Sequence, residues 1–124
     1  MKIHRFDINE LEWAIENTVL TTLIFGREDI ETPFAMFWGV LPSGKEVLPH
    51  HHPTAELYIV TDGEGEMMVN GESETVAAGS TIHIPPKAHH SLRNDNREDL
   101  RFLVISYESN ADIKGLSLTA LNLN

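Results

Sequence analysis

Residues 44–56 read GKEVLPHHHPTAE and place three consecutive histidines before a proline. Successive side chains of an extended segment point to opposite faces, so His50 and His52 share one face and His51 lies on the other. Two imidazoles on one face can converge on a single point. The alternative is an exposed polar loop, which a run of histidines before a proline also fits.

Glu56 opens the next apolar run, after a turn at Pro53. From there, alternation places Glu56, Tyr58 and Val60 on one face. If that face lies inside a barrel, a carboxylate is placed in an apolar cavity, and a cation with imidazole co-ligands is the usual remedy for its burial. Taken alone, Glu56 is also compatible with a surface position at the start of a strand.

Short runs of β-branched and aromatic residues fill the chain from Pro33 onward, and turn sequences separate them. This pattern predicts an all-β sandwich or barrel. Asn70-Gly71 is the strongest hairpin signal, because both turn positions tolerate a positive φ. The predicted strands cover residues 34–41, 57–61, 66–69, 75–78, 81–84, 91–93 and 100–107.

The two ends of the chain are less regular. Apolar residues of segment 8–19 recur at a helix-like spacing, so a short helical turn and an irregular arm both fit, whereas residues 18–25 predict a strand. Residues 109–124 are leucine-bearing and almost uncharged, and they fit an edge strand or a loosely ordered end. No repeat or linker divides the chain, so we expect one domain over residues 1–124.

Residues 85–94 read PPKAHHSLRN and offer a further candidate ligand in His89 or His90. Their distance from the first stretch suits an adjacent strand that returns past it. Apart from His4, all histidines of the chain lie between residues 50 and 90. This clustering is the first indication of function.

At these two stretches the sequence resembles the cupin superfamily. The first motif of that family, G-x5-H-x-H-x3-4-E-x6-G, is met over residues 44–63 by Gly44, His50, His52, Glu56 and Gly63. The second motif, G-x5-P-x-G-x2-H-x3-N, is met over residues 79–94 by Gly79, Pro85, His90 and Asn94. Lys87 stands where the family usually has the second glycine of that motif.

The resemblance implies an antiparallel β-barrel of the cupin type, also called a double-stranded β-helix or jelly roll. It also implies one divalent transition metal per chain, with one or two open coordination positions. The implied ligands are His50, His52, Glu56 and His90, and the choice of His90 over His89 rests on the family spacing alone. Such a ligand set suits Fe, Mn, Ni, Co or Zn without distinguishing them.

The composition excludes several other classes. The chain carries 9 Lys and Arg against 19 Asp and Glu, a formal net charge of −10, which repels nucleic acid and anionic membrane surfaces. It has no cysteine, so neither a disulfide nor a thiolate ligand is available. No apolar run is long enough for a membrane span and no signal peptide opens the chain, so we expect a soluble, cytoplasmic protein.

The pocket above the metal is harder to assign. The large strand residues are core by default, yet some must line the pocket, and the candidates are Met36, Trp38, Tyr58, Met67 and Phe102. His4, His51, His83 and His89 fit surface or packing positions, with His83 or His89 as alternative cavity residues. Lys87 is either a solvated lysine or a cation at the barrel mouth that meets an anionic substrate.

The metal is the strongest catalytic candidate, because the sequence has no serine elbow and no phosphate-binding glycine loop. We predict a metal-dependent enzyme that acts on a small oxygen-bearing organic substrate by dioxygenase, isomerase, lyase or decarboxylase chemistry. The alternative is a cupin that binds or senses a metal or metabolite without turnover. We also expect a homodimer, since a symmetric partner covers an exposed strand edge.

Overall fold

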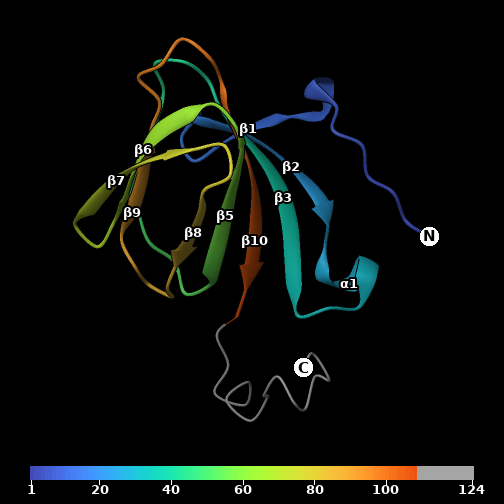
Figure 1. The fold of residues 1–124 in the computed structure, drawn as a ribbon. Helices are drawn as coiled ribbons and strands as arrows, with labels where there is room; N and C mark the ends of the chain where they lie inside the picture. The colour runs from blue at the N-terminus through green and yellow to red at the C-terminus, as the bar shows by residue number, and fades with distance from the viewer. Residues whose placement is uncertain (109–124) are drawn as a thin grey trace.

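Two antiparallel β-sheets make up the computed structural model, which describes residues 1–108 (Figure 1). The larger sheet consists, in spatial order, of β1 (Glu12–Ala14), β2 (Val19–Phe25), β3 (Phe34–Leu41), β10 (Leu100–Tyr107), β5 (Ala55–Asp62) and β8 (Thr81–Ile84). The smaller sheet consists of β4 (Glu46–His50), β9 (His90–Arg93), β6 (Glu64–Val69) and β7 (Glu72–Ala77). The predicted all-β, antiparallel fold is therefore confirmed.

Turn residues set the bounds of most strands. β3, β8 and β10 have the bounds predicted from the sequence, and the other predicted strands differ from the prediction by a few residues at one or both ends. Asn70 and Gly71 have φ values of 48° and 83°, and they connect β6 to β7 so that Val69 pairs with Glu72. Asn70-Gly71 thus forms the hairpin turn that the sequence predicted.

The N-terminal segment differs in part from the expectation. Its helical part is a single 3-10 turn, Ile8–Glu10, where the Asp7 side chain accepts a hydrogen bond from the Asn9 backbone at 2.9 Å. The chain then forms β1, which pairs with β2 and was not predicted. A strand of three residues is too short to show an alternating pattern, which explains why the helix-like spacing dominated the sequence signal.

One short helix, α1 (Arg27–Ile30), connects β2 to β3 and was also not predicted. Within residues 1–108 no helix is both long and apolar enough to cross a membrane. The expectation for residues 109–124 lies outside the described residues.

The core lies between the two sheets. Its buried apolar side chains come from both sheets and from the connecting loops, and they include Val19, Leu41, Val47, Tyr58, Val60, Met67, Val76, Ile84, Ala88, Leu92, Leu100, Phe102 and Val104. The Phe102 ring lies directly over Gly39, where an added Cβ would come within 2.5 Å of the ring. The glycine thus makes room for an aromatic side chain on the inner face of the larger sheet.

Candidate metal centre

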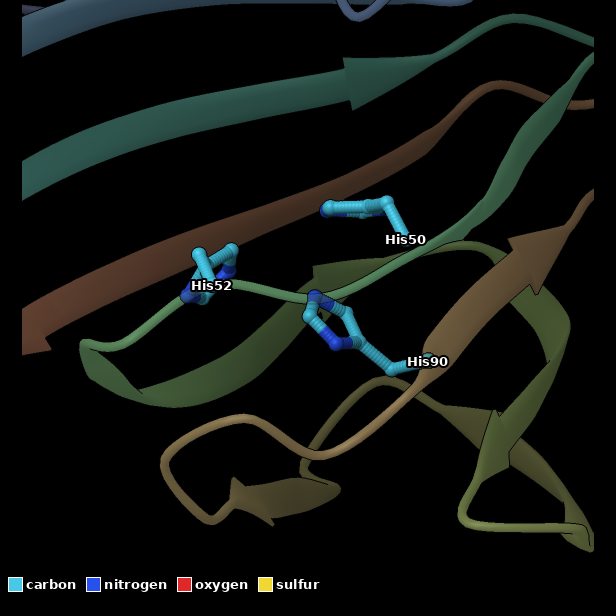
Figure 2. A group of neighbouring side chains, drawn as sticks. All are labelled: His50, His52 and His90. Carbon is cyan, nitrogen blue, oxygen red and sulfur yellow. The ribbon is translucent and has the colours of Figure 1, made fainter.

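Three histidines meet at one end of the smaller sheet, two from neighbouring strands and one from a loop. His50 ends β4, His90 begins β9, and these two residues are paired across the two strands. His52 follows in the loop that leads to β5. One ring nitrogen of each histidine lies within 4.8 Å of the others, and Figure 2 shows the three rings gathered around one space.

Each of the three imidazoles is oriented by a backbone carbonyl. Nδ1 of His50 lies 2.9 Å from the Leu48 carbonyl oxygen, and Nδ1 of His90 lies 2.8 Å from that of Ala88. Nδ1 of His52 lies 2.9 Å from the carbonyl oxygen of Thr54. Because a carbonyl can only accept a hydrogen bond, Nδ1 carries the proton in each ring, which leaves the Nε2 lone pair available to a metal.

Glu56 approaches the histidines from the larger sheet. Its Oε1 lies 2.8 Å from Nε2 of His52 and 3.5 Å from Nε2 of His90. Glu56 Oε1 and His90 Nε2 are both buried without a hydrogen-bond partner, so the short contacts lack hydrogen-bond geometry. With the Nδ1 protonation given above, both atoms are acceptors, and buried acceptors that face one another are unfavourable unless a cation lies between them. The residues present therefore fit a bound metal.

Burial also affects protonation at this site. It lowers the pKa of His50, and the charges that His90 and His52 carry when protonated act in the same direction. His50 therefore stays neutral to a lower pH than a free histidine does. Burial likewise raises the pKa of Tyr58 far above its usual range, and the nearby Glu56 carboxylate adds to this effect. The Tyr58 hydroxyl is thus neutral at ordinary pH.

The remaining histidines lie elsewhere. His51 and His89 are exposed, and their rings lie against each other with centroids 4.4 Å apart. His83 is exposed on β8, and His4 lies in the N-terminal arm. The structure thus places His90, and not its neighbour His89, beside His50 and His52.

Lys87 and Asn94, at two positions of the second motif, make backbone-directed hydrogen bonds, and only that of Lys87 reaches a residue of the histidine cluster. Lys87 has a left-handed conformation, with φ of 64°, so the turn keeps the conformation that glycine favours. Its side chain is exposed, and its backbone N–H donates to the His52 carbonyl at 2.7 Å. Asn94 is fully buried, and its side-chain amide donates to the carbonyls of Leu41 and Glu98, each at 2.9 Å. The sequence indicated a turn residue at Asn94 but not this bridge between segments.

A cavity of about 190 Å³ adjoins the histidines through Glu56. Its lining includes two of the pocket candidates from the sequence, Tyr58 and Phe102. The other lining residues are Ile15, Val19, Thr21, Phe37, Val47, Glu56 and Val104. Of these, Ile15, Thr21 and Phe37 have no distinguishing signal in the sequence, because alternation does not tell which face of a strand is the inner one.

The other pocket candidates lie away from this cavity. Met67 and His83 line a larger hollow of about 620 Å³ between β7 and β8, which neither Glu56 nor the three clustered histidines line. Met36 and Trp38 flank Phe37 in β3, so they point to the outer face of the larger sheet. We therefore regard the smaller cavity as the one connected to the histidine cluster.

Known proteins resemble this chain in sequence and in fold. A family model described as a cupin domain matches residues 36–106. The chain belongs to the cupin family. This cupin has a TM-score of 0.78 to a cupin 2 conserved barrel domain protein from Salinispora arenicola, at 21% identity over 88% of this chain and 90% of the other.

Two further relatives are informative. A predicted oxalate decarboxylase from Thermotoga maritima has a TM-score of 0.68 to this cupin, at 26% identity over 73% of this chain and 81% of the other. An uncharacterised protein from Methanocaldococcus jannaschii is 38% identical over 69 residues, which are 55% of this chain and 55% of that protein. The chain spans about half the length of the curated relatives it matches.

Proposed function

We propose that this cupin binds one divalent transition metal per chain through His50, His52, His90 and Glu56. The observation that carries the proposal is the contact between Glu56 Oε1 and the two Nε2 atoms of His52 and His90, at 2.8 and 3.5 Å. In the neutral rings, the carbonyl contacts make all three atoms acceptors, and a shared cation satisfies them together. Fe, Mn, Ni, Co and Zn all accept such nitrogen and oxygen ligands.

We further propose that the site is catalytic and acts on a small oxygen-bearing organic substrate. When bound, the metal supplies Lewis-acid or redox chemistry at an open position. The residues of the chain bind it, orient its imidazole ligands through backbone carbonyls, and surround the adjoining cavity mainly with apolar groups. The likeness to a predicted oxalate decarboxylase supports an enzyme, since decarboxylation is among the reactions that a metal centre of this kind is expected to perform.

The test uses the full chain, stripped with a chelator and reloaded separately with Fe²⁺, Mn²⁺, Ni²⁺, Co²⁺ and Zn²⁺. Each form is assayed against a panel of small organic acids and other oxygen-bearing metabolites. Turnover by a loaded form that disappears in His90→Gln supports the proposal. Saturable binding of panel compounds without turnover by any form supports the alternative, a cupin that binds or senses its ligand.

We also propose that two copies of the chain pair as a homodimer through the outer face of the larger sheet. Six half-buried apolar side chains on three adjacent strands point to the outer face of the larger sheet, and they are Met36, Trp38, Leu57, Ile59, Leu103 and Ile105. Phe6 of the N-terminal arm packs against Trp38 at one end of this face, with ring centroids 5.2 Å apart. A contiguous apolar face of this kind is typical of an interface.

A further inference from the structure

The cavity beside Glu56 is small. Its volume of about 190 Å³ corresponds to roughly six water molecules at ~30 Å³ each. Pockets for drug-sized ligands start at about 300 Å³. The space therefore fits the body of a fragment-sized molecule whose head group reaches the histidines through the Glu56 end.

The lining of the cavity is mainly apolar. Glu56 is its single charged side chain among the described lining residues, and Thr21 and Tyr58 supply its hydroxyls. Neither Lys nor Arg occurs in that lining. If the head group of the ligand is a carboxylate, a second carboxylate on its body would lie among apolar groups without a cationic partner, which is costly. The lining favours a ligand whose body is uncharged.

Ile15 borders this cavity in a strained conformation. Its φ is 49°, and the next two residues, Glu16 and Asn17, also have left-handed values of 56° and 61°. A β-branched residue rarely adopts this region, so another residue would be expected unless the side chain had a role. The turn is fixed by Thr18, whose hydroxyl donates to the Ile15 carbonyl at 2.6 Å. The Ile15 side chain is 38% exposed and lines the cavity, which places it where the cavity meets the surface.

We propose that the cavity selects a small ligand with one oxygen-bearing head group and an uncharged, apolar body, and that Ile15 packs on this body as a specificity-determining residue. This inference rests on the proposed function, because the head group is expected to bind at the metal. It goes beyond that function because it predicts that dicarboxylates the size of succinate are not preferred ligands.

The experiment measures binding by isothermal titration calorimetry with the full chain loaded with Co²⁺. The probes are acetate, pentanoate and succinate, which share a carboxylate head and differ in their bodies. Pentanoate is expected to bind at least about tenfold more tightly than acetate, because its additional methylenes enter the cavity. It should also bind at least about tenfold more tightly than succinate, whose second charge has no partner.

Ile15→Gly tests the specificity role separately from folding. Glycine adopts a positive φ without strain, which offsets the packing lost with the side chain, so this variant should still fold, and its preference for pentanoate over acetate should fall several-fold. Asn17→Gly is the matched control, since it changes the same turn at a residue outside the cavity lining, and it should keep the preference.

Metal uptake tests the proposed function, and ligand preference tests the inference about the cavity. A chain that takes up no Co²⁺ overturns the proposed function and this inference with it. A cobalt-loaded chain that binds succinate as tightly as pentanoate overturns the inference alone. Equal pentanoate preference in the wild type and in Ile15→Gly overturns the role of Ile15.

Discussion

Glu56 on the larger sheet and His90 on the smaller sheet approach each other to 3.5 Å, and each buries a polar atom there that has no hydrogen-bond partner. The two residues come from strands β5 and β9, which belong to different sheets. Their contact therefore forms only when the sheets pack together. A metal at this point would link the two sheets, so metal binding and folding should be coupled.

Replacing the carboxylate should weaken metal binding. Glu56→Gln keeps the size of the side chain but removes its charge, and we expect the affinity for Co²⁺ or Zn²⁺ to fall by at least about tenfold. Competition with a chromophoric chelator measures this change. Glu72→Gln, on the exposed side of β7, is the control and should leave the affinity unchanged. An unchanged affinity in Glu56→Gln would remove Glu56 from the ligand set.

Metal affinity should depend on pH in a defined direction. A protonated imidazole cannot bind a metal, and free histidine has a pKa near ~6.5, so occupancy should fall steeply as the pH drops below roughly 6. The lowered pKa of His50 keeps that ligand neutral further into the acid range than a free histidine. Full metal content after dialysis at about pH 4.5 would contradict imidazole ligation.

The prediction from sequence was most accurate where local signals determine the structure. Pro42, Ser43 and Gly44 end β3 where expected, because turn residues cannot continue a strand. The spacing of the second motif selected His90, which the structure buries next to His50, and rejected the exposed His89.

Prediction from sequence was least accurate where packing decides. Alternation groups Phe37 apart from Met36 and Trp38, but only the packed sheets reveal that Phe37 faces the cavity. The contact of Glu56 with the histidines could be anticipated from the cost of a buried carboxylate, whereas the approach of Ile15 to the same cavity depends on a left-handed turn that no local signal indicates.

Asn94 should contribute to stability and not to metal binding. Asn94→Ala leaves the carbonyl of Leu41 without its donor in a buried position, so we expect a loss of about 1–3 kcal/mol in the free energy of unfolding. Denaturant unfolding measures the loss. Asn96→Ala removes an exposed hydrogen bond to Glu64 and should cost less. Equal losses in the two variants would show that the buried hydrogen bonds of Asn94 contribute no more to the free energy of unfolding than the exposed one of Asn96.

The outer face of the larger sheet should hold two copies of the chain together. Light scattering at micromolar concentration is expected to give about twice the 13.9 kDa mass of the chain. Leu103→Glu places a charge in the middle of the apolar face and should shift the protein towards the monomer. Thr22→Glu, at the border of the same face beside Trp38, should have a smaller effect. A wild-type monomer at this concentration would contradict the dimer.

The most direct test is the metal content of the purified full chain and four histidine variants, measured by elemental analysis after dialysis against a weak chelator. We predict about one metal per chain in the wild type, and the same in His51→Ala and His89→Ala, whose rings lie against each other away from the cluster. His52→Ala and His90→Ala should lose most of the metal. Full occupancy in His52→Ala, or equal losses in His89→Ala and His90→Ala, would contradict the proposed metal centre.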